Sequence, residues 1–435
     1  MRKKLSILTL GCPKNLVDSE KLAEKLRLRG ITVLDGESGA EDSDILLVNT
    51  CGFIEDAKKE SIDEILGLAE IKRNAGGRAH LVVFGCLAKR YGKELKKEMP
   101  EIDALFGVAE EDAIVEYCAD VLGTNGSPAH RNKEAEAPAY AYLKIAEGCD
   151  RGCSYCVIPS IRGGFRSSKP DEILKDAERH IRAGVRELIL VSQDLLSYGR
   201  AMVAPPVGLR GYGLTNLISD IASISGDFWI RLLYLNPSSI DDKFIDFAGG
   251  QKKLVKYFDI PFQHSEGKIL RLMKRPGGRK KFLALIKKIR GAMPDAALRT
   301  TLMVGFPGET EEDFKGLREF VEEARFDRLG VFKYSKEEDT PASKLRGHVP
   351  ERIKARRLDE VMTLQASISL EKNMELVGRR VRALIEEPGV GRIYSQAPEI
   401  DGVTIVNGIS PKPGKFAKVK ITGATDYDLL AEAAK

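Results

Sequence analysis

The sequence predicts an α/β protein in three parts: an N-terminal parallel α/β domain, a partial barrel of six strand–helix units, and a small C-terminal antiparallel β-barrel of the oligonucleotide-binding type. Short apolar runs alternate with amphipathic helical patterns over most of the 435 residues, which favours parallel sheets. After a long charged helix at about 350–375, the pattern changes to short strands separated by Gly and Pro, which is typical of a small barrel. We expect the first domain at residues 1–123, a linker at 124–138, the partial barrel at 139–365, and the C-terminal barrel with its leading helix at 366–435.

The first domain is predicted from three apolar runs, at residues 5–10, 44–49 and 81–84. Each has the length and composition of a buried strand, and helical patterns separate them. A helix should begin at about Asn15, with Asp18 placed to complete its N-terminal cap.

A cysteine follows each of these three strands: Cys12, Cys51 and Cys86. The carboxyl ends of parallel strands meet at one edge of a sheet, so we expect the three thiols to converge there. One such Cys would usually be a core residue, but three in the same structural position indicate an iron–sulfur cluster with three protein ligands. Cys118 lies in a helical run and is expected to be a core thiol without a further role.

The middle segment contains six strand-then-helix units. Six units are too few for a closed eightfold barrel, and they predict a partial barrel whose chemistry lies at the carboxyl ends of its strands. The expected strands are residues 142–146, 187–192, 229–235, 257–261, 299–305 and 328–334. In the third part the expected strands are residues 381–386, 391–395, 403–406 and 416–422.

Three more cysteines, Cys149, Cys153 and Cys156, follow the first strand of the middle segment. A tight loop containing Gly152 can bring the three sulfurs to one cubic four-iron cluster, which leaves the fourth iron free for a small molecule. This spacing resembles the signature of radical S-adenosylmethionine enzymes. The alternative is a zinc knuckle, but zinc needs four ligands, and no second Cys pair or His run follows.

Composition and charge narrow the class of protein. A hydrophobic content of 43% and a charged content of 31% are ordinary for a soluble globular chain, and a net charge of +5 permits a nucleic-acid or ribosomal partner without requiring one. Seven cysteines, an odd number, favour metal or redox chemistry over disulfides. The short apolar run after Met1 ends in Gly-Cys-Pro-Lys, so it predicts a strand and a cytoplasmic protein. No run approaches the ~18 apolar residues of a membrane span.

The chain as a whole resembles the radical S-adenosylmethionine methylthiotransferases, whose domains are a cluster-binding domain, a radical core and a TRAM barrel. The matching motifs are Glu-Gly-Cys at 147–149, Val-Ile-Pro at 157–159, Val-Gly-Phe-Pro-Gly-Glu-Thr at 304–310 and Val-Phe-Lys-Tyr-Ser at 331–335. One departure is Asp339, where the family commonly has Gly. The run Gly-Cys-Pro-Lys-Asn-Leu-Val-Asp-Ser-Glu at 11–20 is similar to the RimO branch, whereas the tRNA-modifying branch tends to have Gln-Met-Asn after that Cys.

The resemblance implies a reaction and its cofactors. It implies that a methylthio group is added to the β-carbon of an aspartate on small-subunit ribosomal protein S-twelve, alone or in the assembled subunit, with two S-adenosylmethionine molecules consumed. One 4Fe–4S cluster, on Cys149, Cys153 and Cys156, would generate the 5′-deoxyadenosyl radical. A second cluster, on the three cysteines of the first domain, would present the sulfur. A low-potential electron donor of the flavodoxin or ferredoxin type is also implied.

Several polar residues of the core are candidates for ligand binding. Gln193, Arg231 and Gly305 lie on or at the carboxyl ends of core strands and could hold S-adenosylmethionine, although Arg231 could equally form an ion pair inside the barrel. His264 could contact substrate, but a structural histidine is the more ordinary role. Arg162 and Arg166 could bind a carboxylate or be solvated. The long loop at 197–214 has the length of a lid or binding loop.

Two other functions remain open from the sequence. The first is the same chemistry on a modified adenosine of tRNA, which the motif after Cys12 and the near-neutral third domain disfavour. The second is a non-enzymatic two-cluster electron carrier. Such carriers are short and give every iron a protein ligand, unlike this chain.

Overall fold

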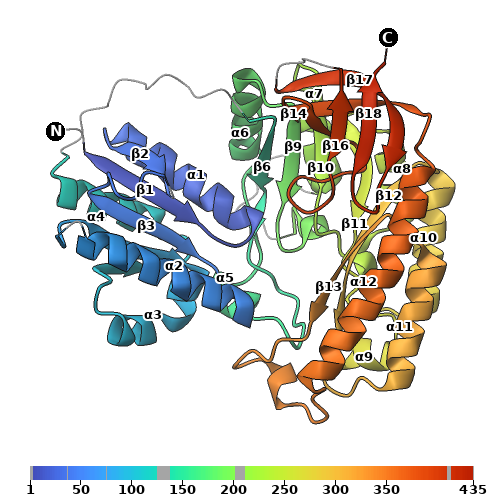
Figure 1. Cartoon of the computed structure of the whole chain (residues 1–435), viewed down its shortest axis with the longest axis horizontal. Helices are drawn as coiled ribbons and strands as arrows, with labels where there is room; N and C mark the ends of the chain where they lie inside the picture. Colours follow the sequence, from blue (N-terminus) through green and yellow to red (C-terminus); the bar gives the residue numbers. More distant parts are fainter. Residues whose placement is uncertain are drawn as a thin grey trace.

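The computed structural model describes residues 3–36, 38–74, 76–124, 138–200, 211–408 and 413–434. Figure 1 shows the N-terminal α/β domain beside a six-stranded sheet, and the C-terminal barrel against that sheet. Most of the expected linker, residues 125–137, and the middle of the expected binding loop, residues 201–210, lie outside the described residues. No helix in the described part of the chain is long and apolar enough to cross a membrane.

The first domain is a five-stranded sheet with the order β2-β1-β3-β4-β5, and all its pairings are parallel. The three expected strands are confirmed, and β2 and β5 are additional. Its strands are β1 (Lys4–Thr9), β2 (Thr32–Asp35), β3 (Ile45–Thr50), β4 (His80–Gly85) and β5 (Ala104–Phe106). Its helices are α1 (Pro13–Leu28), α2 (Glu55–Asn74), α3 (Cys86–Glu98) and α4 (Glu111–Leu122).

Apolar side chains pack on both faces of this sheet. Helices α2 and α3 supply one core and α1 and α4 the other, and Cys118 is fully buried in the second, as expected of a core thiol. The expectation that Asp18 caps α1 was wrong. The helix begins at Pro13 with Cys12 as its N-cap residue and no side-chain cap, and the Asp18 carboxylate forms ion pairs with the core domain instead.

The core domain confirms the six expected strands as one parallel sheet with the order β13-β12-β11-β10-β9-β6. Helices follow the strands in turn and cover the outer face. The strands are β6 (Tyr140–Lys144), β9 (Glu187–Val191), β10 (Trp229–Leu232), β11 (Leu254–Asp259), β12 (Ala297–Val304) and β13 (Arg328–Lys333). The main helices are α6 (Pro170–Ala183), α7 (Leu214–Ser223), α8 (Asp242–Gly250), α10 (Arg279–Ala292) and α11 (Glu311–Ala324). Shorter elements are β7 (Ala146–Glu147), α5 (Ile158–Arg162), β8 (Arg166–Ser167) and α9 (Gly267–Leu272).

The third part begins with α12 (Glu351–Met374), which matches the expected long helix and runs through the boundary expected at 365/366. A closed five-stranded barrel follows, in which β16 pairs with β18 in parallel and the other pairings are antiparallel. The strand β18 was not expected. The strands are β14 (Arg380–Glu387), β15 (Val390–Ile393), β16 (Thr404–Asn407), β17 (Lys415–Ala424) and β18 (Leu429–Ala433).

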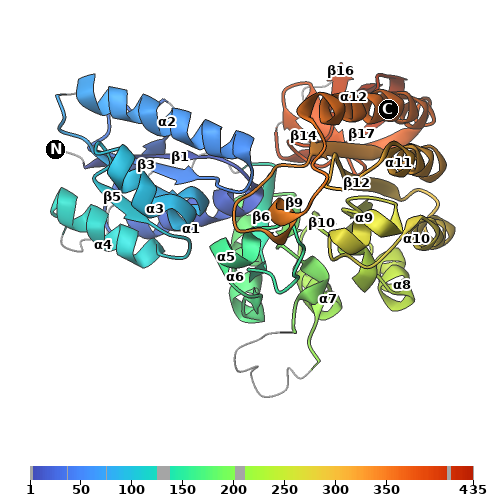
Figure 2. The ribbon, with the colours of Figure 1, turned by 90° about the horizontal axis from the view of Figure 1, so that it is seen from below.

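The inner face of the six-stranded sheet is covered by the other two parts of the chain. One buried cluster combines Tyr142 and Tyr257 from the sheet with Leu384 from the barrel and Val17 from α1. The ring centroids of Trp229 and Phe416 lie 4.7 Å apart across the contact with the barrel. Because an open sheet cannot fill its own interior as a closed barrel does, these contacts fix the first domain and the C-terminal barrel against the core. Figure 2 shows the first domain beside the core from below.

Candidate active site

The loop between β7 and α5 holds Cys149, Cys153 and Cys156 at the carboxyl end of the core sheet. The backbone amide of Cys149 donates to the Gly163 carbonyl at 3.1 Å, and that of Cys156 donates to the Cys153 carbonyl at 3.2 Å. The three thiols lie close enough for the charge on one to affect the pKa of another. The loop therefore gathers three sulfurs in one place.

Two N–H groups point at these sulfurs. The Arg151 amide donates to Cys149 Sγ at 3.4 Å, and Arg275 Nη1 donates to Cys153 Sγ at 3.8 Å. Burial raises the pKa of Cys149 and raises that of Cys156 to about 12. Without a metal these two thiols keep their protons at neutral pH, and a bound metal would replace the protons. Donors aimed at sulfur together with partly buried thiols are a suitable environment for a thiolate-ligated cluster.

The glycine that this loop requires is Gly148. It has φ +75°, and a Cβ there would lie 2.2 Å from the Gly164 carbonyl oxygen. Gly152, the residue expected to allow the bend, has open space around it and lies outside the left-handed region. The turn that requires glycine therefore lies before Cys149, while the turn between Cys153 and Cys156, closed by the bond from the Cys156 amide to the Cys153 carbonyl, does not depend on Gly152.

We expect Gly148→Ala to lower the free energy of unfolding by about 2–3 kcal/mol, because it combines a left-handed backbone with a clash against a carbonyl group. Gly152→Ala is the matched control in the same loop and should change it by less than about 0.5 kcal/mol. Urea denaturation of the two variants measures both values. Equal losses in the two variants would show that the loop geometry is wrong.

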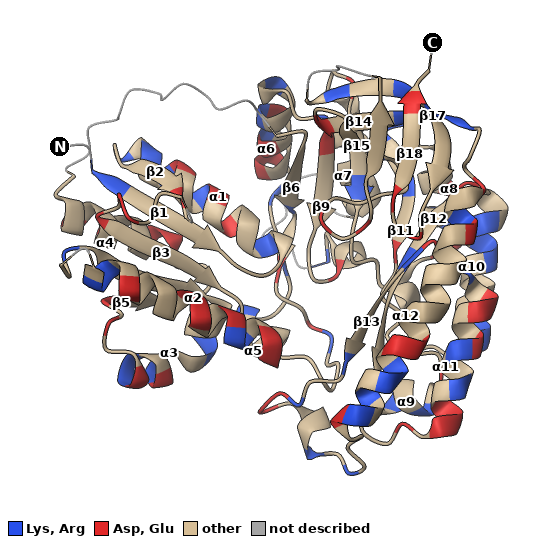
Figure 3. Cartoon of the chain, viewed as in Figure 1, with Lys and Arg blue, Asp and Glu red and all other residues tan. Residues whose placement is uncertain are grey.

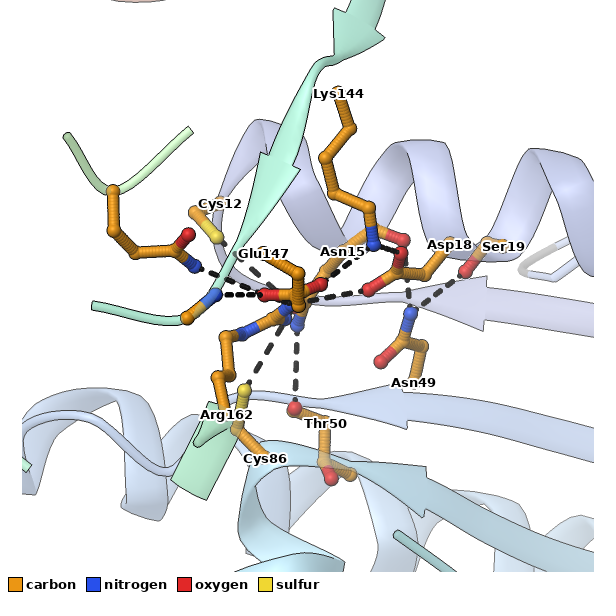
Figure 4. Close-up of polar contacts among 12 residues, drawn as sticks. Cys12, Asn15, Asp18, Ser19, Asn49, Thr50, Cys86, Lys144, Glu147 and Arg162 are labelled. Atoms are coloured by element: carbon orange, nitrogen blue, oxygen red, sulfur yellow. Dashed lines mark hydrogen bonds and ion pairs between the residues drawn. The ribbon is translucent and has the colours of Figure 1, made fainter. Parts of the chain in front are cut away.

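The first domain brings its own three cysteines together. Cys12, Cys51 and Cys86 follow β1, β3 and β4 at one edge of the sheet. Asn15 Oδ1 lies 4.0 Å from Cys12 Sγ and 3.9 Å from Cys86 Sγ (Figure 4). A Cβ on Gly11 would lie 3.1 Å from Cys51 Sγ. Burial raises the pKa of Cys51 to about 11 and raises that of Cys86, while Lys14 and Arg162 outweigh burial and lower that of Cys12.

Neither group of cysteines is arranged around a single ion. Among the described residues, no three His, Cys, Asp or Glu side chains are placed to hold one metal ion. Zinc needs its ligands around one centre, whereas a cubic cluster binds each thiolate through a different iron and so holds the sulfurs further apart. A donor set of three thiols fits a four-iron cluster in which one iron has no protein ligand.

A buried network joins the two groups of cysteines. We call Asn15, Asp18, Lys144, Glu147 and Arg162 the junction network (Figure 4). Arg162 Nη1 donates to both carboxylate oxygens of Glu147 at 3.0 Å, and Arg162 Nη2 donates to Asn15 Oδ1 at 2.5 Å. Lys144 forms ion pairs with Asp18 and with Glu147, the latter at 2.7 Å.

The junction network carries contacts from one group of cysteines to the other. Arg162 precedes Gly163, whose carbonyl accepts from the Cys149 amide, and Asn15 lies beside Cys12 and Cys86. Burial would raise the pKa of Glu147, but Lys144 and Arg162 lower it to about 2. The carboxylate is therefore charged and paired at neutral pH. Its partners Lys144 and Arg162 also pair with Asp18 of α1, and these pairs tie the first domain to the core.

Another cation, Lys14, lies at the same junction. Its Nζ lies over the ring of Tyr234, 4.1 Å from the centroid, and Tyr234 follows β10 at the carboxyl edge of the core sheet. Burial disfavours the charged form of Lys14, yet the neighbouring Cys12 and Tyr234 raise its pKa overall. Lys14 is therefore a protonated ammonium group between the first domain and the core.

Comparison with known proteins agrees with this geometry. The uncharacterized protein family UPF0004 matches residues 4–107, the radical SAM superfamily residues 143–321 and the TRAM domain residues 377–434. The "Ribosomal protein uS12 methylthiotransferase RimO" of Thermodesulfovibrio yellowstonii is 50% identical, over 98% of this chain and 99% of that protein. The protein of the same name from Pelotomaculum thermopropionicum is 45% identical over 99% of both chains. This chain belongs to the RimO family of methylthiotransferases.

Membership of the RimO family makes this chain a transferase of the radical SAM superfamily, for which a 4Fe–4S cluster and S-adenosylmethionine are the implied cofactors. A solved structure, the cobalamin-dependent S-adenosylmethionine radical enzyme OxsB, has a TM-score of 0.53 and 12% identity over 84% of this chain and 56% of that chain. This similarity concerns the fold alone. The family's usual Gly is replaced here by Asp339, which adopts φ +61°, a conformation that Asp tolerates better than most residues.

Two of the residues expected to hold S-adenosylmethionine in this RimO family chain, Gln193 and Gly305, follow the carboxyl ends of β9 and β12. Gln193 Nε2 donates to Glu147 Oε1 at 3.2 Å, and its buried Oε1 has no partner among the described residues. Gly305 has φ +72°, and a Cβ there would lie 2.3 Å from Lys354 Cγ, so this position requires glycine for packing. Both remain predictions as cofactor-binding residues.

Arg231 lies deeper in the fold. Its Nε donates to Glu187 Oε1 at 2.6 Å and its Nη1 to the Tyr394 carbonyl of the barrel at 2.8 Å. Arg392 from the barrel shares the Glu187 carboxylate, also at 2.6 Å. These are the paired contacts that the ion-pair alternative predicted, and they join the core to the barrel. A contact of Arg231 with S-adenosylmethionine stays a prediction.

The two arginines after the cysteine loop have different environments. Arg162 is buried and binds the chain's own carboxylates, whereas Arg166 is exposed. Sequence reasoning missed Lys14, Lys144, Glu147 and the pairing role of Asp18. Glu147 and Asp18 do lie in the motifs by which the chain resembles the RimO family. One charged residue beside each cysteine motif was a signal that could have suggested a contact between the two motif regions.

His264 occupies a buried structural position after β11. Its Nδ1 accepts from the Glu266 amide at 3.0 Å, its Nε2 has no hydrogen-bond partner among the described residues, and burial lowers its pKa to about 3. The histidine is therefore neutral in the folded chain. Because its folded pKa lies below the unfolded value of 6.5, it contributes stability above pH 6.5 that is lost as the pH falls toward 3.

We expect the free energy of unfolding to fall below pH 6.5 with a contribution from His264 of up to about 1.4 kcal/mol per pH unit. His264→Asn keeps an acceptor for the Glu266 amide but cannot be protonated, so its stability should depend less on pH in this range. Urea midpoints of both proteins at pH 7, 6 and 5 measure the difference. Parallel curves for the two proteins would contradict the buried neutral histidine.

Proposed function

We propose that this chain adds a methylthio group to the β-carbon of an aspartate of ribosomal protein uS12, the small-subunit protein S-twelve, and uses two S-adenosylmethionine molecules per turnover. Relatives that are 41–50% identical to this chain bear the name ribosomal protein uS12 methylthiotransferase, and this name supports uS12 as the substrate. The observation that carries the proposal is the chain of contacts through Arg162 and Asn15 that connects the two groups of cysteines.

The proposed cofactors are two 4Fe–4S clusters, one on Cys149, Cys153 and Cys156 and one on Cys12, Cys51 and Cys86, together with S-adenosylmethionine near Gln193 and Gly305. When bound, these groups supply radical chemistry for an unactivated C–H bond and the sulfur to be inserted. A low-potential donor of the flavodoxin or ferredoxin type is the proposed source of electrons, and the cytoplasm, where ribosomes assemble, is the proposed location.

The chain's own residues hold the two groups of thiols, the first domain and the core in place. The cysteine loop and the strand ends orient the two groups of thiols, and the junction network keeps the first domain against the core while both carboxylates remain paired. The apolar cluster around Tyr142 and Val17 excludes water from the inner face of the core sheet next to the junction. A dry, fixed site is what radical chemistry needs to avoid side reactions.

The nearest alternative substrate is a modified adenosine of tRNA. In Figure 3, basic and acidic segments alternate along α10, α11 and α12, and both signs occur on the barrel strands. A surface of mixed charge gives RNA little electrostatic attraction, which favours a protein substrate. A non-enzymatic electron carrier is not retained, because the RimO family is a family of transferases.

Mass spectrometry of a RimO-deficient bacterial strain supplied with this chain tests the proposal. We expect uS12 to gain one methylthio group, tRNA nucleosides to be unchanged, and Cys153→Ala to give no product. A methylthio group on tRNA adenosine with unmodified uS12 would replace this proposal with the tRNA alternative.

A further inference from the structure

Three cations lie at the junction between the first domain and the core, and two of them have acidic partners. Arg162 and Lys144 both bind Glu147 and Asp18. Lys14 differs: its side chain has no hydrogen bond or ion pair with any oxygen in the described part of the chain, although the residue is only 8% exposed. Burying an unpaired ammonium group is costly, so its retention calls for an explanation.

The ring of Tyr234 holds Lys14 in place without using its hydrogen-bond donors. The Nζ–centroid distance of 4.1 Å is that of a cation–π contact, which leaves the N–H bonds of the ammonium group available. Tyr234 has φ +64°, a strained conformation for a large residue, and strain of this kind is typical of functional sites. The strained turn after β10 presents the ring to the first domain.

The position of Lys14 relates it to both groups of cysteines. It follows Cys12 by two residues, and the ring that it contacts, Tyr234, follows β10 at the carboxyl edge of the core sheet, the edge at which the Cys149 loop also lies. Lys14 also lies in the first turn of α1, where the helix dipole adds to the positive potential. An anion that enters between the two groups of cysteines would contact this ammonium group.

We propose that Lys14 binds the side-chain carboxylate of the substrate aspartate and so determines the preference for aspartate. This inference rests on the proposed function. The reacting β-carbon is bonded directly to that carboxylate, so a single charge-assisted hydrogen bond at the carboxylate limits where the β-hydrogens can lie. A buried cation also rejects asparagine, whose amide has no charge to pair with it.

The test compares binding of purified uS12 with binding of uS12 in which the target aspartate is replaced by asparagine, using anaerobically reconstituted enzyme. We expect the unmodified enzyme to prefer aspartate by about 10- to 100-fold. Lys14→Met and Lys14→Gln should reduce the preference to about threefold or less, and Lys14→Arg should keep most of it. Lys21→Met, on the same helix, is the matched control and should leave the preference unchanged, because the half-exposed Lys21 side chain pairs with Asp176 of α6 at 3.6 Å.

Each other outcome overturns the inference. An undiminished preference for aspartate in both neutral variants would show that another group recognises the carboxylate. Loss of iron from both neutral variants but not from Lys14→Arg would assign the lysine to charge balance of the neighbouring cluster. If the unmodified enzyme neither binds nor methylthiolates uS12, the proposed function itself fails, and that result is distinct from the other two.

Discussion

Replacing Cys51 by alanine should abolish methylthio transfer while leaving measurable cleavage of S-adenosylmethionine. The reason is spatial: Cys51 lies with Cys12 and Cys86 at the edge of the first domain, whereas the loop proposed to support cleavage is part of the core. Cys153→Ala should stop both reactions, because it removes one of the three thiols of that loop. We expect a loss of at least about 10³-fold in each affected reaction, as when an essential catalytic group is removed.

Chromatography of 5′-deoxyadenosine and mass spectrometry of uS12, run on the same reconstituted samples, measure the two reactions separately. Cys118→Ala is the matched control, because this thiol is buried in the α4 core away from both groups. Its product yield per folded chain should equal that of the unmodified protein. Methylthio product from Cys51→Ala would contradict the sulfur-insertion role of the first domain.

Replacing Arg162 by methionine should lower the free energy of unfolding by about 3–5 kcal/mol. The side chain is 2% exposed and pairs with both Glu147 and Asp18, so its loss leaves these two buried carboxylates to share Lys144. Arg162→Lys should recover only part of the loss, because an ammonium group cannot reach Glu147 and Asn15 with the same paired geometry.

Arg166→Met provides the comparison, since Arg166 lies four residues further on and is exposed. We expect it to change the unfolding free energy by less than about 0.5 kcal/mol. Urea denaturation of the metal-free chains gives the stabilities without a contribution from iron. If Arg162→Met were as stable as Arg166→Met, the junction network would not hold the domains together.

The sheets of this fold could be predicted because buried strands leave a strong local signal. Ile45–Thr50 is buried at every position, and its apolar run is apparent in the sequence. The strands that were missed, among them β2, β5, β8 and β18, are short and only partly buried or alternate with exposed residues, so their runs are weak. The cysteines could be placed at one edge because parallel strands share the direction of their carboxyl ends.

The contacts of the junction network could not be predicted from local sequence. Arg162 and Asp18 are 144 residues apart, and Lys144 and Asp18 are 126 apart, so only the docking of two domains brings them together. The same reason explains the wrong capping role for Asp18, whose local spacing suited a cap. Gly148 and Gly152 also look equivalent in the sequence, and only the folded backbone distinguishes them: Gly148 has φ +75° and lies against the carbonyls of Gly163 and Gly164.

Electron paramagnetic resonance of the reduced, reconstituted chain tests most directly whether two cluster sites meet at one junction. We predict two cluster signals in the unmodified chain, one of which is lost in Cys51→Ala and the other in Cys153→Ala. Each signal should relax faster in the unmodified chain than in the variant that lacks the other cluster. A single signal in the unmodified chain, or two signals whose relaxation does not change when the other site is removed, would contradict the account.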